Sequence, residues 1–114
     1  MIIEDENYKI WYDNEKNTVF FDGSLRLWDP TGYVKIRKML RDLYSLDTPA
    51  LLLDFRELKF LNSSGISMLC KFIFEAKDLG QKPIKIIGNQ EVRWQIKSFE
   101  NLKKLWSKIE LEFL

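Results

Sequence analysis

Residues 62–65, with the sequence Asn-Ser-Ser-Gly, put two hydroxyl groups between two apolar segments of the chain. Serine and asparagine at the start of a helix accept hydrogen bonds from its first backbone N–H groups. These N–H groups lie at the positive end of the helix dipole and also attract anions, including a phosphoryl group on a serine. The chemistry expected here is helix capping, with phosphorylation of Ser63 as the alternative.

Other kinds of functional site lack the residues that they need. The sequence contains no histidine and a single cysteine, Cys70. Ser-His-Asp and Cys-His catalysis, histidine-ligated zinc and thiolate metal clusters are therefore excluded. Neither glycine-rich nucleotide-binding motif, G-x-x-x-x-G-K-[ST] or G-x-G-x-x-G, occurs. Because no spacing of the 17 acidic residues picks out a catalytic pair, we expect a protein that is not an enzyme and holds no metal or cofactor.

Length and charge restrict the possible partners. The chain has 114 residues, and we expect 1–114 to fold as a single domain. Its net charge of +1 gives no electrostatic reason to bind nucleic acid or an anionic membrane. No apolar run approaches the roughly 20 residues that span a bilayer, and the acidic N-terminus is unlike a signal peptide. One cysteine cannot form an internal disulfide. We expect a cytoplasmic protein with no nucleic-acid partner and no membrane insertion.

The elements that must position residues 62–65 begin with a predicted hairpin and a helix. Residues 8–12 and 18–27 have the composition of strands. The segment Asp22-Gly23-Ser24 interrupts the second strand and indicates a bulge. Asp29 suits the N-cap of a following helix and Pro30 its first position, and this helix must end before Pro49.

The second half of the chain alternates strands and helices. The apolar run 50–53 predicts a buried strand, and apolar residues at helical spacing predict a helix from Ser63 to its C-cap Gly80. A strand at 83–87, a helix capped by Asn89 and a strand at 109–113 complete the order β-β-α-β-α-β-α-β. This order predicts an α/β fold with one mixed sheet, parallel in its middle, and helices mainly on one face.

The segment LLLDFRELKFLNSSGI resembles the signature of the STAS domain, the family of sulfate transporters and anti-sigma factor antagonists. In that family a buried strand ends near an aspartate, and Asp-Ser-[Ser/Thr]-Gly opens a helix. The segments FFDGSL at 20–25 and KIIG at 85–88, followed by VRW at 92–94, are also similar to the family. The resemblance covers roughly residues 8 to 114 and implies a STAS-like fold.

The resemblance implies a function in protein–protein switching. In the antagonist branch the unphosphorylated domain binds an anti-sigma factor that is also a serine kinase, and phosphorylation of the serine after the motif aspartate ends the complex. That position is Ser63 here, with Ser64 beside it as a second candidate. Asn62 replaces the aspartate and carries no charge. The implied partner-binding residues are Asn62, Ser63, Ser64, Gly65, Gly23, Ser24 and Lys71.

Two other functions stay open from the sequence. One is a scaffold subunit, a STAS domain that assembles into a larger signalling complex and is never phosphorylated, which the uncharged Asn62 favours. The other is a module that binds a small anion or a nucleotide at the start of the helix. For the chain by itself we expect a monomer or a weak homodimer.

Several side chains outside the signature have two interpretations each. We expect Trp28 to pack at the end of the sheet rather than to anchor a partner, although tryptophan is enriched at interfaces. Cys70 lies on an apolar stripe and is expected to be an inert thiol. Arg93, Trp94 and Lys97 are expected to form a solvated helix face.

Overall fold

The alternation of strands and helices builds one six-stranded sheet in a computed structural model, which describes residues 1–114 (for Pro30, the backbone alone). The order of the strands in the sheet is their order in the chain. The strands are β1 (Ile2–Glu4), β2 (Tyr8–Asp13), β3 (Thr18–Leu25), β4 (Leu51–Leu61), β5 (Ile84–Gly88) and β6 (Ile109–Phe113). The helices are α1 (Pro30–Tyr44), α2 (Ser63–Leu79) and α3 (Arg93–Lys103).

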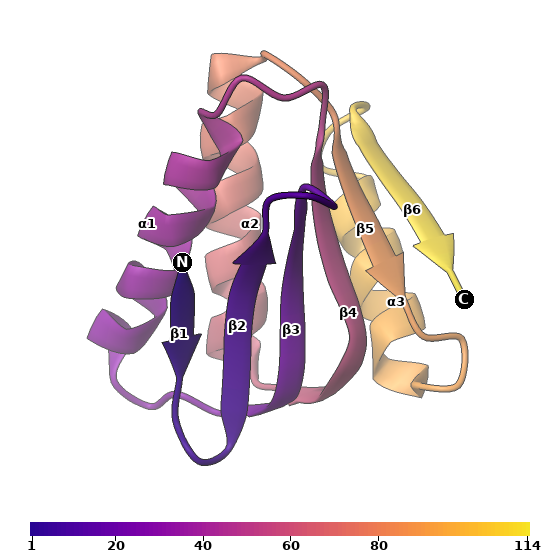
Figure 1. Ribbon diagram of the computed structural model, residues 1–114. Coiled ribbons are helices and arrows are strands. Elements are labelled where there is room, and N and C mark those ends of the chain that lie inside the picture. The colour runs from indigo at the N-terminus through magenta and orange to yellow at the C-terminus, as the bar shows by residue number, and fades with distance from the viewer.

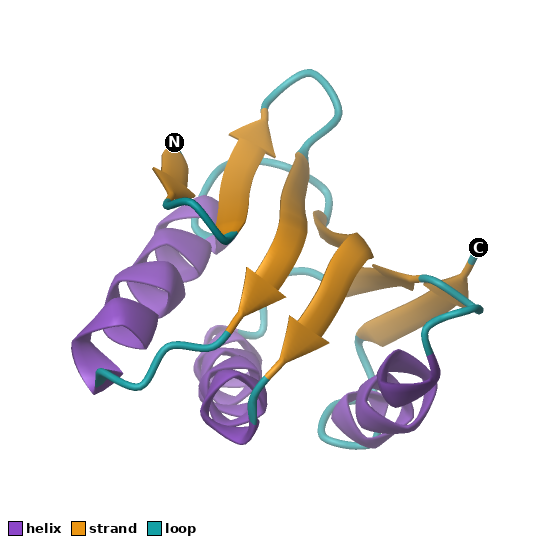
Figure 2. Ribbon diagram, turned by 90° about the horizontal axis from the view of Figure 1, so that it is seen from below, coloured by secondary structure: helices purple, strands orange, loops and turns teal.

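The sheet is mixed. Strands β1, β2 and β3 pair antiparallel, whereas β3, β4, β5 and β6 run parallel. Each parallel step passes through one helix, and because such crossovers are right-handed, successive helices lie on the same face of the sheet. Figure 1 shows the termini at opposite edges of the sheet, and Figure 2 shows the three helices on one side of it. The predicted fold class is confirmed.

The strands differ from the prediction at two places. Strand β1 was not expected, because its three residues are too few to show alternation; it joins the sheet through pairing of Ile3 with Ile10. Strand β4 continues to Leu61 instead of ending at 53. Its second half does not alternate strictly, since the register against β3 shifts at two places around Gly23. The additional residues lie on β4, whereas β3 pairs with β2 without a shift, so the bulge is on β4 and not in the segment Asp22-Gly23-Ser24 where it was predicted.

Helix α3 begins later than predicted. Val92, not Asn89, is its N-cap residue, and no side chain caps it. The Asn89 side chain instead accepts a hydrogen bond from the backbone N–H of Glu91 (2.9 Å), within the turn that precedes the helix. The helix is continuous from Arg93 to Lys103.

The hydrophobic core fills the space between the sheet and the three helices. Phe21 of β3 stacks on Phe55 of β4, with ring centroids 4.3 Å apart, and Phe55 packs against Phe99 of α3 at 4.8 Å. Gln95 of α3 is also fully buried, and its side-chain amide donates to the backbone oxygens of Phe55 (2.7 Å) and Leu58 (2.9 Å). These bonds attach α3 to the irregular half of β4.

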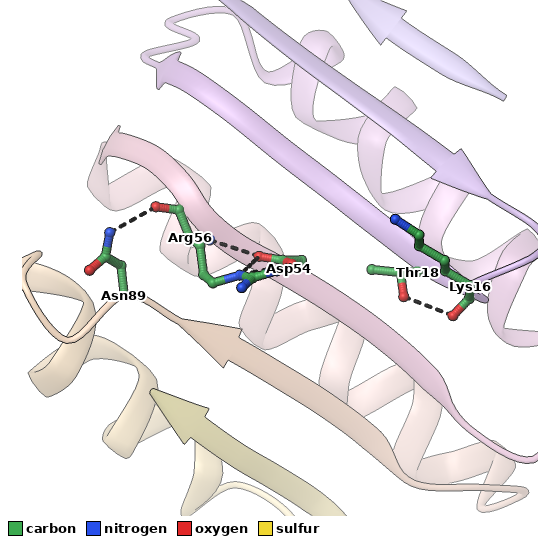
Figure 3. A network of polar contacts seen from close by, with 5 residues as sticks. All are labelled: Lys16, Thr18, Asp54, Arg56 and Asn89. Carbon is green, nitrogen blue, oxygen red and sulfur yellow. Dashed lines mark hydrogen bonds and ion pairs between the residues drawn. The ribbon is translucent and has the colours of Figure 1, made fainter. Parts of the chain in front are cut away.

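The opposite face of the sheet carries no helix. Because side chains alternate along a strand, Asp54 and Arg56 point to this face while Phe55 points to the core. The Arg56 guanidinium binds the Asp54 carboxylate, with Nη2 and Oδ2 2.8 Å apart, and the Asn89 side chain donates to the Arg56 carbonyl (3.2 Å), as Figure 3 shows. The buried Asp54 carboxylate on this face is thus paired with an arginine of the same strand.

Candidate functional site

The start of α2 lies where the sequence placed it. Asn62 is the N-cap, and its side-chain Oδ1 accepts a hydrogen bond from the backbone N–H of Gly65 (3.0 Å). Ser63 and Ser64 are the first two helical residues and both are exposed. Their hydroxyls are not needed for the cap, since asparagine supplies it. No acidic residue occupies the first turn of α2, so a negative charge added there would meet no like charge within that turn.

Gly65 lies beneath the surface of this site. It is buried, and a Cβ atom at its position would lie 2.2 Å from Leu61 Cδ1 and 2.9 Å from the Tyr33 hydroxyl oxygen. Van der Waals contact needs more than 3 Å, so only glycine fits without movement. Gly65 therefore serves the tight entry into the helix, and it presents no surface to a partner.

Asn62 also joins α2 to the segment between β3 and α1. The Tyr33 hydroxyl donates to Asn62 Oδ1 (2.5 Å), and Asn62 Nδ2 donates to the carbonyl oxygen of Leu27 (3.2 Å). The backbone N–H of Asn62 donates to the carbonyl oxygen of Leu25 (3.2 Å). Burial raises the pKa of Tyr33, and a tyrosine hydroxyl, whose usual pKa is about 10, is a hydrogen-bond donor at neutral pH. The Asn62 side chain therefore connects the start of α2, helix α1 and the segment between β3 and α1.

A groove of about 260 Å³ runs between α1 and α2 beside these bonds. Trp28, at its rim, is 89% exposed and Val34 is 52% exposed, although large apolar side chains are ordinarily buried. The expected packing of Trp28 against the sheet is therefore wrong. Strand β3 ends at Leu25, before Trp28, and the indole is exposed to solvent. The groove is lined by Leu27, Trp28, Tyr33, Val34, Arg37, Ser64, Ser67, Met68 and Lys71.

The charged residues of the groove are basic. Arg37 is paired with Glu75 of α2 (Nε to Oε1, 3.0 Å), and Arg41 binds the other oxygen of the same carboxylate at 2.9 Å. Lys71 is exposed and forms no ion pair among the described residues. It lines the groove together with Ser64. An acidic group on a partner would therefore find one free positive charge here.

Gly23 and Ser24 lie next to this groove but not in it. Ser24 lines a separate hollow with Tyr8 and Leu27, and Leu27 is shared by the two hollows. Gly23 has a φ of +96°, and a Cβ there would lie 2.2 Å from the carbonyl oxygen of Asn7. Gly23 is therefore required by its positive φ and by the close approach of the backbone at Asn7. Both residues are half-buried.

The remaining sequence candidates divide between the core and the surface. Trp94 is half-buried, and its indole N–H donates to the carbonyl oxygen of Lys59 (2.8 Å), so its expected place on a solvated face is wrong. Arg93 and Lys97 are exposed, as expected. Cys70 is half-buried, and burial raises the pKa of its thiol, so it stays protonated and unreactive at neutral pH.

The contribution of α1 to the site was not predicted. Val34 lies outside the apolar stripe of this helix, which runs through Tyr33, Ile36 and Leu40. Val34 lies about 100° around the helix from Tyr33. That offset was the available signal that Val34 points away from the core.

None of the described helices is long and apolar enough to cross a membrane.

Sequence comparison finds no matching protein-family model and no similar curated protein. The three-dimensional arrangement, in contrast, defines a STAS-like fold, as the sequence motif implied.

Solved structures with this fold include regulatory proteins of two bacteria. SiaC of Pseudomonas aeruginosa matches with a TM-score of 0.72 and 15% identity, over 100% of this chain and 96% of SiaC. A chain in the crystal structure of the Pseudomonas aeruginosa diguanylate cyclase SiaD with its activator SiaC also matches with a TM-score of 0.72 and 15% identity. This match covers 100% of this chain and 99% of the chain in that crystal structure. An anti-sigma factor antagonist from Mycobacterium paratuberculosis matches with a TM-score of 0.58 and 14% identity. This match covers 96% of this chain and 82% of the antagonist chain. The likeness concerns the fold.

Proposed function

We propose that this chain is a non-enzymatic regulatory domain that binds another protein through the groove between α1 and α2 and the exposed start of α2. The observation that carries the proposal is Trp28, whose side chain is 89% exposed at the rim of that groove. Tryptophan is the residue most often found among the dominant contacts of protein interfaces. Burying it and Val34 against a partner would remove both from water.

The neighbours in fold support a regulatory role. SiaC is described as the activator of a diguanylate cyclase and is seen in complex with it, and the other neighbour is an anti-sigma factor antagonist. Both descriptions are of proteins that control a second protein. The expected partner of this chain is accordingly a bacterial signalling protein, such as an anti-sigma factor with kinase activity, a cyclase or another subunit of a signalling complex. The expected setting is the bacterial cytoplasm.

A phosphorylation switch at Ser63 or Ser64 forms part of the proposal. Both hydroxyls are exposed, and Ser64 lines the groove. A phosphoryl group adds about −1.5 to −2 charges and considerable volume. On the partner-binding surface it would obstruct a complex formed by the unmodified chain. The alternative, a scaffold subunit that is never phosphorylated, is favoured by Asn62, which lacks the charge of the family aspartate.

The binding surface can be tested by affinity capture followed by calorimetry. The wild-type chain, Trp28→Ala and Leu46→Ala are used as baits in native lysate, and the captured protein is then purified and titrated against each. Leu46 is a matched control, because it is 44% exposed but follows the far end of α1. Trp28→Ala should weaken binding at least about 30-fold, as loss of a dominant contact does, and Leu46→Ala should not. Equal affinities for the three would reject the groove.

The switch needs its own set of variants. Ser63→Asp and Ser64→Asp introduce a charge, and the corresponding alanine variants remove only the hydroxyl. If phosphorylation controls the complex, one aspartate variant loses the partner while its alanine counterpart retains it. Full binding by all four variants would leave the scaffold role.

A further inference from the structure

We propose that Asn62 is a positioning residue, which holds the segment carrying Trp28 against the start of α2 through its side-chain amide nitrogen. The two walls of the groove, the Trp28 segment and the first turn of α2, would then be fixed relative to one another by one side chain. The importance of this for binding rests on the proposed function, but the contact itself can be tested on the free chain.

The contacts around the Trp28 segment support this role. The indole of Trp28 is almost fully exposed, so packing of its own side chain does not fix the segment. Asn62 Nδ2 donates to the carbonyl oxygen of Leu27, the preceding residue, at 3.2 Å. The Tyr33 hydroxyl lies 3.4 Å from the backbone nitrogen of Leu27 and 3.4 Å from the carbonyl oxygen of Leu25. The same hydroxyl donates to Asn62 Oδ1 at 2.5 Å.

An asparagine can make this set of bonds, whereas an aspartate cannot. The side-chain oxygen of Asn62 accepts from Gly65 and Tyr33, and its nitrogen donates to Leu27. An ionised carboxylate has acceptors only. It would keep the cap and the bond from Tyr33, because aspartate is as good an N-cap as asparagine. It would place a second acceptor opposite the Leu27 oxygen and repel it. Asn62→Asp therefore separates positioning from capping.

Asn89 provides a matched control. Its Oδ1 accepts from a backbone N–H in the following turn (Glu91, 2.9 Å), and its Nδ2 donates to the carbonyl oxygen of Arg56 in another segment (3.2 Å). Figure 3 shows this second bond. Asn89→Asp makes the same chemical change at a site away from the groove.

The test is ¹⁵N NMR of the free full chain, with hydrogen exchange measured on the same samples. Trp28→Phe identifies the indole N–H signal of Trp28. In Asn62→Asp the amide signals of Leu27 and Trp28 and this indole signal should shift or broaden. The amide of Leu27, which lies 3.4 Å from the Tyr33 hydroxyl, should exchange at least about tenfold faster. The amide of Gly65 should stay protected, because the cap is retained. Asn89→Asp should leave residues 26–28 unchanged.

Unchanged signals and exchange at 26–28 in folded Asn62→Asp would overturn the proposal. Changes of the same size at residues 26–28 in Asn89→Asp would also overturn the proposal. Should Asn62→Asp fail to fold, Asn62→Ser gives the same comparison, because its hydroxyl can cap but is too short to reach Leu27. The outcome is independent of the proposed function, since no partner is present. If a partner is identified, the loss caused by Asn62→Asp should be smaller when Trp28 is already alanine, because the two residues act together.

Discussion

At the scale of single residues, Gly65 leaves no room for an added Cβ atom. A Cβ would approach Leu61 and the Tyr33 hydroxyl, both of which are parts of the packed interior. Gly65→Ala should lower the free energy of unfolding by about 1–3 kcal/mol, the usual effect of overpacking. Urea denaturation followed by circular dichroism measures this change.

The neighbouring serine is the control for this prediction. Ser64 is exposed and does not cap the helix, so Ser64→Ala should stay within about 0.5 kcal/mol of the wild type. A Gly65→Ala variant as stable as Ser64→Ala would show that the close packing described here is wrong.

Asp22 predicts a dependence of stability on pH. Its pKa is raised from 3.8, first by burial and then by the carboxylates of Glu57 and Asp54, against a smaller lowering by Lys9. A raised pKa means that the folded state holds the proton more tightly than the unfolded state. The contribution of Asp22 to stability is therefore greatest below about pH 4 and is lost as the pH rises through the raised pKa.

Asp22→Asn tests this assignment. Near pH 3.5 wild type and variant should melt together, and at pH 7 the variant should be more stable by up to about 0.5 kcal/mol, or about 2–3 °C in Tm. Differential scanning calorimetry at the two pH values gives the comparison. A variant that is less stable than the wild type at pH 7 would mean that the attraction to Lys9 dominates.

At the scale of elements, Glu75 is the charged link between the two helices of the groove. Its carboxylate binds Arg37 and Arg41 of α1 and is about one third exposed. Glu75→Gln should lower the free energy of unfolding by about 0.5–1 kcal/mol, since partly exposed ion pairs contribute modestly. The difference should shrink at about 1 M salt, where such pairs are screened.

The Lys38–Asp42 pair is the comparison for that measurement. It lies within α1 and both side chains are more exposed than Glu75. Asp42→Asn should cost no more than about 0.5 kcal/mol. If urea denaturation gives the two variants the same small effect at both salt concentrations, Glu75 does not stabilise the contact between α1 and α2.

The elements that the sequence predicts well are those with a regular period. The capping residue Asp29 of α1 and the αL residue Gly80 at the end of α2 both have the expected role in the structure. Strand β4 beyond residue 53 was missed because its bulged pairing breaks the two-residue period. The buried Gln95, which satisfies backbone groups of that irregular segment, has no signal in the sequence.

The sequence predicts only the part of the candidate site that depends on a local pattern. Ser63 and Ser64 follow from the helix start, which is a local pattern. The exposure of Trp28 does not, because it depends on where α1 lies relative to the end of β3. Because tryptophan is generally found in largely buried positions, the sequence predicted that Trp28 packs against the sheet. The bond from Asn62 to Leu27 spans 35 positions in the chain and is equally invisible to local reasoning.

At the scale of the whole molecule, the two faces of the sheet differ in how their apolar side chains are covered. On the open face Trp11 stacks on Phe20, with centroids 5.1 Å apart, and the ammonium groups of Lys9 and Lys16 lie over the two rings. Both aromatic rings are half-buried. On the helical side, shown in Figure 2, Trp28 has no such cover. The helical side is therefore the side expected to bind a partner.

Hydrogen–deuterium exchange of the chain with its captured partner tests this central claim most directly. The account predicts that residues 26–37 and 63–71, which form the groove, become protected in the complex while the open face of the sheet does not change. Protection confined to the open face, around Trp11 and Phe20, with unchanged exchange at 26–37 and 63–71, would contradict it.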